Sequence, residues 1–364
     1  MKTKKIYQKG ITLVELMIAL ALSAFLISGM IQIFNGSKQT FLLQQGLVNI
    51  QENARFTLDI LSKDLRMAGY SGCSREVKIA NNLVTPVYMG NLTVPIVGYE
   101  TSGGGTYTAP TGIDWADLPT NVRSMVTGFS SDQTYSDIIT LRRTSSQGVN
   151  VSEGMTQPTE DIKLVNLSDF EYPEADTTVY IGDCDKGSIF QVTGITVPSD
   201  TAESVTVKHA AGSGSTGNET SSLFPSEGKW QGLRGFDTDA ALYKLSGSSV
   251  VYFVAPSDGC SDVLSLWRSD GDDDPQELIP GIETVEILYG VDSNKDGTPN
   301  RYSTADNIDL TVTENYDGSR ETAEDIVSVR IKLTVNSIED LDGEDPITRE
   351  FTQTFKVRNE GGNS

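Results

Sequence analysis

The chain has 364 residues, enough to bury a large core in one elaborated domain or in two to three smaller ones. Gly and Pro are frequent and 37% of residues are hydrophobic, which suits many short strands joined by turns and excludes a disordered composition. The formal net charge is −22, and four lysines without any acid lie in the first nine residues, so the remainder carries −26. Such an acidic body repels phosphate backbones, which makes nucleic acid a poor partner.

The first predicted element is an apolar helix over residues 11–34. Within these 24 residues the only ionisable side chain is Glu15. At about 1.5 Å per residue the helix reaches roughly 36 Å, enough to cross a hydrocarbon core of about 30 Å. The four lysines before it predict a cytoplasmic N-terminus, with everything after Phe34 on the other side of the membrane.

Gly10 distinguishes this segment from an ordinary secretory signal, whose shorter apolar run ends in small residues at the cleavage site. Here the small residue precedes the apolar run, so cleavage after Gly10 would remove a leader of residues 1–10 and keep the helix. The new amine on Ile11, from the same or a neighbouring helix, is a partner for Glu15, because an unpaired carboxylate in lipid is strongly unfavourable. The alternative is a plain signal anchor with Glu15 at the membrane edge.

The leader and the start of the helix carry a family resemblance. Residues 9–16, Lys-Gly-Ile-Thr-Leu-Val-Glu-Leu, resemble the class III leader of type IV prepilins and type II secretion pseudopilins. The resemblance implies that a prepilin peptidase cuts between Gly10 and Ile11 and methylates the new amino terminus at Ile11. It also implies that Glu15 guides the subunit into a growing filament. Ile11 departs from the usual phenylalanine, but this position mainly requires a bulky apolar residue.

The helical period continues beyond Phe34, although the polarity changes. Apolar residues recur at steps of three and four and form one stripe: Leu47, Ile50, Ala54, Leu58, Leu61, Leu65 and Ala68. Gly69 is a natural C-cap, because glycine accepts the left-handed conformation that ends helices. We therefore predict one helix over residues 11–68, whose amphipathic second half, residues 35–68, packs on a globular head.

A second resemblance begins at the end of this helix. The segments similar to PilW-type minor pilins are residues 51–56 and 61–70, then Cys73, and more weakly 188–193, 265–268 and 287–292. Packing alone explains the apolar positions, so the similarity rests on the Arg-Met-Ala-Gly-Tyr ending and the nearby cysteine. It implies a minor pilin that acts with other minor pilins, the major pilin, the prepilin peptidase and an inner-membrane assembly platform.

Cysteine and histidine are scarce. The three cysteines are Cys73, Cys184 and Cys260, without a Cys-x-x-Cys pair, and the single histidine is His209, which argues against a zinc site or a Cys–His catalytic pair. In an oxidising compartment the simplest arrangement is one disulfide and one thiol. The sequence does not choose among three pairings, and Cys73–Cys184 is the candidate disulfide. We predict that the chain is not an enzyme, since it has no nucleophile motif and no phosphate-binding glycine loop.

The predicted fold class is α+β and pilin-like: the long helix packs on an antiparallel β-sheet head, residues 69–364, with long loop insertions. The strand candidates are residues 138–142, 179–181, 189–197, 250–254, 263–267, 284–289, 327–335 and 351–357. Residues 327–335 alternate apolar and polar side chains, as a sheet with one wet face requires. We expect 351–357 to pair with them as a final hairpin. Residues 98–134 and 198–235 have the composition of insertions.

One head segment has the pattern of a cation site. Residues 292–297 repeat the opening of an EF-hand calcium loop, with oxygen ligands at positions 1, 3 and 5 and glycine at position 6. The candidate ligands are Asp292, Asn294, Asp296, Thr298 through its carbonyl, and Asn300. Ser303 replaces the closing glutamate of that loop. The alternatives are a calcium site, which makes calcium the one candidate cofactor, and an Asx-rich turn that binds nothing.

The leading functional prediction is a minor pilin of a type IV pilus. It would lie in the inner membrane with its head in the periplasm and then enter the pilus, at or near the tip, where it takes part in the initiation of assembly. One alternative is a type II secretion pseudopilin, which has the same leader and helix. Another is a pilus-tip adhesin or a calcium-dependent binding module that uses the large loops.

Overall fold

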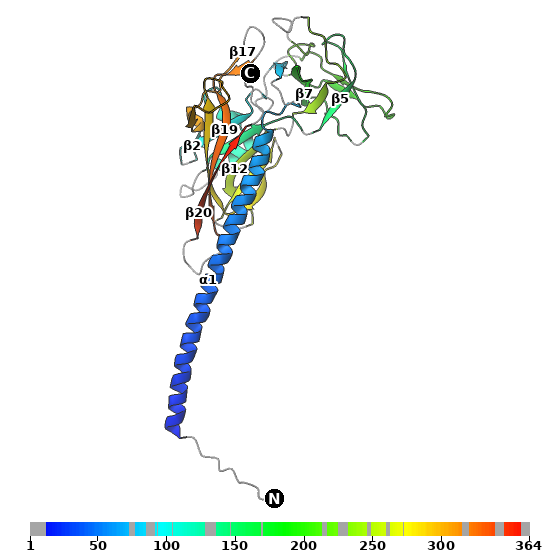
Figure 1. Cartoon of the computed structure of the whole chain (residues 1–364). Helices are drawn as coiled ribbons and strands as arrows, with labels where there is room; N and C mark the ends of the chain where they lie inside the picture. Colours follow the sequence, from blue (N-terminus) through cyan, green and yellow to red (C-terminus); the bar gives the residue numbers. More distant parts are fainter. Residues whose placement is uncertain are drawn as a thin grey trace, which may run out of the picture.

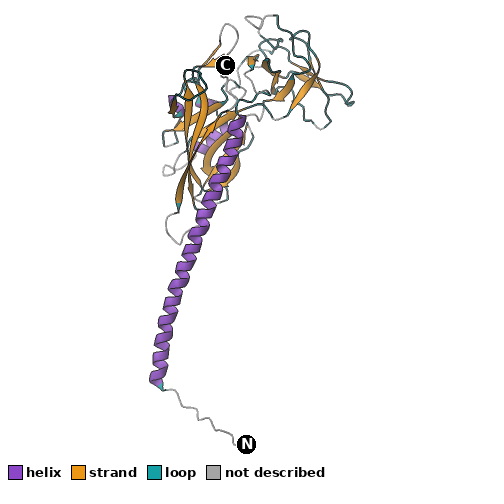
Figure 2. Ribbon diagram, viewed as in Figure 1, coloured by secondary structure: helices purple, strands orange, loops and turns teal. Residues whose placement is uncertain are grey.

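A long helix carries a β-rich head at its C-terminal end (Figure 1). The computed structural model describes residues 12–72, 77–84, 92, 94–103, 105–127, 136–145, 147–168, 170–212, 217–224, 232–245, 249–259, 263–271, 273–314, 320–338 and 346–357. Strands are the main regular elements of the described head, and the helix extends far beyond it (Figure 2). The fold class is therefore α+β and pilin-like, as the sequence predicts.

Helix α1, Leu13–Met67, begins and ends close to the predicted bounds. Thr12 is its N-cap: the Thr12 side chain accepts a hydrogen bond from the Glu15 amide, and the Glu15 side chain accepts one from the Thr12 amide. At the other end Gly69 adopts a φ of 74°, the left-handed conformation expected of the residue that follows a helix. With 55 residues, α1 is roughly 80 Å long.

The predicted apolar stripe is the face of α1 that packs on the head. The buried residues of α1 are Gly46, Ile50, Ala54, Thr57, Leu61 and Leu65. Gly46 is the first of them, and a Cβ added there would lie 3.3 Å from the Ser337 Cβ, so glycine permits the close approach of helix and head. Before Gly46 none of the described helix residues is buried.

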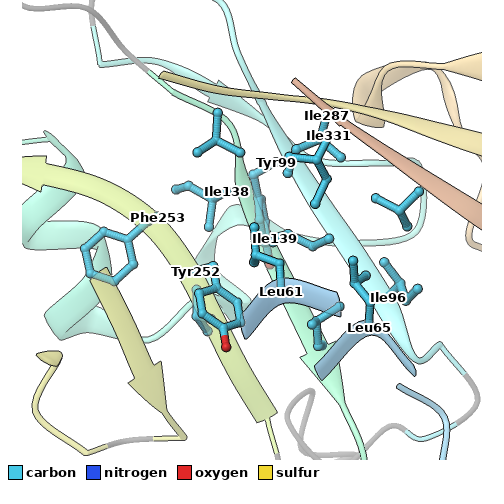
Figure 3. Packing of buried hydrophobic residues seen from close by; sticks show 14 of the residues in the cluster. Leu61, Leu65, Ile96, Tyr99, Ile138, Ile139, Tyr252, Phe253, Ile287 and Ile331 are labelled. Atoms are coloured by element: carbon cyan, nitrogen blue, oxygen red, sulfur yellow. The ribbon is translucent and has the colours of Figure 1, made fainter. Parts of the chain in front are cut away.

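Two sheets and the second half of α1 enclose the first core of the head. Their orders are β14-β13-β12-β4-β2-β3 and β16-β15-β19-β20, with antiparallel pairs throughout. The strands are β2 (Ile96–Thr101), β3 (Tyr107–Thr108), β4 (Ile138–Arg142), β12 (Ser249–Pro256), β13 (Leu264–Asp270), β14 (Gln276–Pro280), β15 (Ile282–Asp292), β16 (Arg301–Ser303), β19 (Asp325–Asn336) and β20 (Thr348–Lys356). Figure 3 shows Leu61 and Leu65 of α1 among side chains of this core.

The final hairpin of the prediction is confirmed. Strands β19 and β20 pair antiparallel, with Val329 opposite Phe355 and Leu333 opposite Phe351. Val329 and Leu333 are fully buried and Phe355 is nearly so, which places the apolar members of both alternating runs in the first core. The period of two therefore identified both the strands and their inward face.

A second hydrophobic core lies in the middle part of the chain. Its sheet has the order β1-β8-β7-β11-β5-β6-β10-β9. The strands are β1 (Lys78–Asn81), β5 (Gly148–Glu153), β6 (Ile162–Leu164), β7 (Thr178–Gly182), β8 (Lys186–Gln191), β9 (Gly194–Thr196), β10 (Val205–Lys208) and β11 (Ala241–Lys244). This second lobe lies beyond the C-terminal end of α1, on the side away from β20 (Figure 1). The sequence treated residues 69–364 as one head and did not reveal this subdivision.

Parts of the predicted insertions are ordered elements. Residues 98–134 contain the end of β2, all of β3, the short 3-10 helix η2 (Trp115–Asp117) and helix α2 (Thr120–Thr127), whose Val122 and Val126 are fully buried in the first core. The predicted strand 189–197 is divided between β8 and β9, since the chain turns after Gln191. The remaining described elements are the 3-10 helix η4 (Ala305–Asn307) and the hairpin of β17 (Val312–Glu314) and β18 (Arg320–Thr322).

Candidate assembly site

The N-terminal end of α1 is closed by Glu15. One oxygen of its carboxylate, Oε2, accepts hydrogen bonds from the Thr12 amide and the Thr12 hydroxyl, both at 3.0 Å. Thr12 follows Ile11 directly in the chain, so the carboxylate lies at the helix end from which a cleaved terminus would start. Gly10 and Ile11, the predicted cleavage and methylation sites, lie outside the described residues.

The first half of α1 presents apolar side chains on all sides. Leu13, Phe25 and Phe34 are 74%, 79% and 68% exposed. The most apolar 18-residue window of α1 has a mean hydropathy of 2.2, and none of it is buried in the described part of the molecule. A helix of this length and composition can cross a membrane. Water is a poor solvent for such a surface, so lipid or other apolar helices are its natural surroundings.

An ion-pair network fastens the second half of α1 to the six-stranded sheet. The Asp64 carboxylate lies 3.0 Å from Arg143 Nη1, and it accepts a hydrogen bond of 2.6 Å from the Tyr252 hydroxyl. Arg268 Nε of β13 lies 3.5 Å from the same carboxylate. The Asp64 side chain is only 13% exposed, so the two guanidinium groups offset the loss of water around its charge. Burial raises the pKa of the Tyr252 hydroxyl, which keeps it protonated as the donor.

This network joins two segments that the sequence linked only by resemblance. Asp64 belongs to residues 61–70 and Arg268 to residues 265–268, about two hundred positions further along the chain. About three turns earlier in α1, Asn53 Nδ2 donates to the Pro280 carbonyl at 2.9 Å. The polar residues of both segments thus set how the head sits on the helix. No local pattern could have indicated the contact, because each partner alone reads as a surface charge.

The predicted calcium loop is a compact turn at the end of β15. Asp292 is 1% exposed, and its Oδ1 accepts hydrogen bonds from the amides of Asn294 at 3.2 Å and Lys295 at 2.7 Å. Its Oδ2 accepts the Gly297 amide at 2.6 Å. Lys295 and Gly297 have φ values of 59° and 80°, which produces the tight turn. Both Asp292 oxygens therefore bond to the loop backbone, as in an Asx-rich turn.

The other candidate calcium ligands also bond within the loop. Asn300 Oδ1 accepts the Ser293 amide at 2.8 Å, and Asp296 Oδ1 accepts the Thr298 amide at 2.9 Å. The structure therefore brings the five predicted ligands into one turn. In the described part of the chain no three acidic, histidine or cysteine side chains are grouped closely enough to hold a metal. Calcium binding stays a prediction.

Cys184 is disulfide-bonded. Both other cysteines, Cys73 and Cys260, lie outside the described residues, so the Cys73–Cys184 pairing stays a prediction. His209 is buried and lies edge-on to the Phe190 ring, and its Nε2 is 2.8 Å from the Glu160 carbonyl. Burial lowers the pKa of His209, and the side chain fills space in the second core.

Two carboxylates, the buried Asp137 and the half-buried Glu100, were not anticipated. Asp137 is 5% exposed and joins the two sheets of the first core: its Oδ1 accepts the Thr101 amide at 3.2 Å and its Oδ2 the Ile287 amide at 2.8 Å. Burial raises the pKa of Asp137 to about 6. Burial, with the Asp137 charge as the second cause, raises the pKa of Glu100 to about 7. In a chain with 50 acidic residues, nothing in the sequence marks this pair.

Comparison with known protein families gives two matches. One family, described as type IV pilus-assembly protein W, matches residues 251–360, and the prokaryotic N-terminal methylation motif matches residues 5–31. The chain thus carries a PilW-type segment and a prepilin methylation motif, the combination found in PilW-type minor pilins. The first match runs from β12 through β20, whereas the second lobe, built mainly from earlier residues, lies outside both matches. No curated protein and no solved structure matches this PilW-type chain.

Proposed function

We propose that this PilW-type pilin takes part in the initiation of type IV pilus assembly and is incorporated at or near the pilus tip. The observation that carries the proposal is the bare apolar half of α1, most of which lies within the match to the methylation motif and which ends where the head begins. Such a subunit resides in the inner membrane with a periplasmic head. It leaves the membrane when its helix packs against the helices of other subunits.

Glu15 is the assembly residue in this mechanism. Its carboxylate lies at the end of α1, where Thr12 holds it by two hydrogen bonds. In an apolar surrounding it favours a cationic partner, and the methylated amine of a neighbouring subunit supplies one. Packing two apolar helices leaves their axial position free, because apolar contacts are non-directional, whereas one ion pair defines it.

Cleavage and methylation test the proposal directly. The full chain is expressed with and without a prepilin peptidase, and its N-terminus is read by mass spectrometry. We expect an N-methylated Ile11 terminus only with the peptidase. If the leader is retained in its presence, the chain is not processed as a pilin and the proposal fails.

Glu15→Ala separates processing from assembly. We expect normal cleavage and methylation, because the peptidase site precedes Glu15, but far fewer pili per cell, counted by electron microscopy. Thr12→Val is the matched control: it removes the hydroxyl contact to Glu15 and keeps the carboxylate. An unchanged pilus number in Glu15→Ala would contradict the assigned role.

A second candidate is an adhesive role for the tip subunit, favoured by the second lobe. This lobe has its own hydrophobic core and lies at the end of the molecule opposite the bare helix (Figure 1). At a pilus tip it would be the part directed away from the cell. Variants that carry exposed-residue substitutions only in the second lobe would lose adhesion and keep their pili. A type II secretion role is distinguished by the partners that co-purify with the chain.

A further inference from the structure

Strand β20 forms an unusually long open edge. It is the last strand in the order β16-β15-β19-β20, so its partner β19 covers one side only. Strand β20 has nine residues. Strand β16, at the other edge of the same sheet, has three, and β3, at one edge of the six-stranded sheet, has two. Long open edges offer backbone groups to other strands, and proteins normally shorten or cover them. The edge therefore needs a physical explanation.

The register identifies the backbone groups that point outward. The Val357 amide bonds to the Val327 carbonyl, and the Ser337 amide bonds to the Ile347 carbonyl. In an antiparallel pair, bonded and non-bonded residues alternate, so Phe351, Gln353 and Phe355 direct their amides and carbonyls to β19. The residues with outward amides and carbonyls are Thr348, Glu350, Thr352, Thr354 and Lys356. Among the described residues, no backbone group bonds to this outer side.

The side chains of β20 favour pairing in its centre. Between Glu350 and Lys356 there is no charge, and Thr352 and Thr354 are exposed and β-branched, as strand residues tend to be. Phe355 on the opposite face anchors the strand in the core. Charged residues, which usually protect edges, stand only at the two ends. A partner strand could therefore cover the centre and use the end charges to define its register.

The edge lies where neighbouring subunits come close. β20 starts one residue after Ile347, which together with Ser337 lines the point where Gly46 of α1 first meets the head. It runs beside α1 at the margin of the molecule (Figure 1). Subunits whose bare helices lie side by side bring their heads together at this height. The edge is thus continuous with the helix surface on which the proposed function rests.

We propose that β20 pairs antiparallel with an edge strand in the head of a different pilin-type subunit. This proposal rests on the proposed function, which supplies neighbours with parallel helices. Symmetric antiparallel pairing of β20 with β20 of a second copy would reverse the direction of one helix. Two copies held in one membrane cannot adopt that arrangement, so the occupant is another chain of the same polarity.

The chemistry of the edge defines the partner strand. The exposed Lys356 favours a carboxylate opposite it, and the two threonines favour β-branched or small polar residues. Glu350 already contacts Lys332, with Glu350 Oε1 and Lys332 Nζ 3.0 Å apart, so it adds little attraction for an acidic strand. We expect an uncharged strand centre with one acidic residue near its end.

Site-specific cross-linking in cells that assemble the pilus tests the pairing. A photoreactive amino acid replaces Thr352 in one full-length variant and Phe34 in another, and mass spectrometry identifies the linked peptides. We expect the Thr352 probe to link to an edge strand in the head of a different pilin-type chain. We expect the Phe34 probe to link to a pilin helix, which reports the helix packing of the proposed function.

The two probes test the strand pairing and the helix packing independently of each other. Helix links without strand links, or Thr352 links only to a second copy or to a chain that is not a pilin, would overturn the strand pairing and leave the proposed function standing. Absence of both links would overturn both. Thr352→Pro removes an amide that points outward and makes no hydrogen bond to β19, so the pairing of β19 and β20 is preserved. If the strand link forms, we expect this variant to lower cross-linking from a photoreactive residue at position 354 by about tenfold or more. Thr352→Val is the matched control and should retain the link.

Discussion

The two halves of α1 have the same backbone and different partners. Up to Gly46 the helix makes no buried contact within the described molecule, and its apolar surface suits lipid or other helices. After Gly46 one face is buried and Asp64 joins two guanidinium groups and a hydroxyl of the head. The comparison shows that one continuous helix can be an anchor and a core element, because burial is decided by side chains and not by the backbone.

The largest effect should come from the Asp64 network. Asp64→Ala leaves Arg143 and Arg268 without their shared carboxylate, and breaking a buried pair of this kind typically costs about 3–5 kcal/mol. The measurement is urea unfolding of the detergent-solubilised full chain, followed by the circular dichroism of the strands. Asp59→Ala is the matched control, since that carboxylate is 68% exposed and lies 4.0 Å from Lys63. A loss equal to that of the control would show that the network does not hold the helix to the head.

The next largest effects are expected from Leu→Ala substitutions, which should act differently in the two halves of α1. Leu61 is 1% exposed, and Leu61→Ala should lower the free energy of unfolding of the head by about 2–5 kcal/mol. Leu22 is 60% exposed, and Leu22→Ala should leave head unfolding unchanged while it weakens retention in the membrane. Urea unfolding and membrane fractionation measure the two effects. Equal destabilisation by both variants would mean that the halves of α1 are not independent.

The sequence predicted α1, its buried stripe and the hairpin of β19 and β20, because periods of 3.6 and two are local signals. It did not predict the second lobe, in which β1 pairs with β8 more than a hundred residues later. Periodicity does not say which strands pair. The capping of α1 by Thr12 and Glu15 was not predicted, since the helix was expected to begin at Ile11. The contact of Asp64 with Arg268 depends on the whole fold.

Valine substitutions at two glycines of α1 should have a smaller effect on head stability, and one that depends on position. A Cβ at Gly46 would lie 3.3 Å from Ser337, whereas one at Gly36 would meet nothing within 4 Å. Gly46→Val should therefore destabilise the head by about 1–3 kcal/mol, as overpacked sites do. Gly36→Val should leave the urea midpoint of the head unchanged. The expectation is wrong if Gly46→Val is as neutral as Gly36→Val.

The smallest expected effect is a dependence on pH that belongs to the head alone. From Leu16 to Ser37 α1 has no ionisable side chain, whereas the head contains the half-buried Glu100 and the buried Asp137, which joins its two sheets. Burial raises the pKa of Glu100 from 4.5 to about 7, and Asp137, Asp306 and Glu286 add to the shift. The protonated form is thus favoured by folding, and its contribution is complete below pH 4.5 and lost as the pH rises through about 7.

Urea midpoints measured between pH 5 and pH 8 test this sign. The midpoint of the unmodified chain should fall with rising pH, because the folded head must ionise two carboxyl groups that face further acids. Glu100→Gln keeps the shape and cannot ionise, so its midpoint should fall less and lie above that of the unmodified chain at pH 8. Glu174→Gln, at an exposed position, should follow the unmodified chain. A urea midpoint that rises with pH in the unmodified chain would contradict this expectation. So would a Glu100→Gln variant whose midpoint falls with pH as steeply as that of the unmodified chain, because Glu100 would then not govern the pH response.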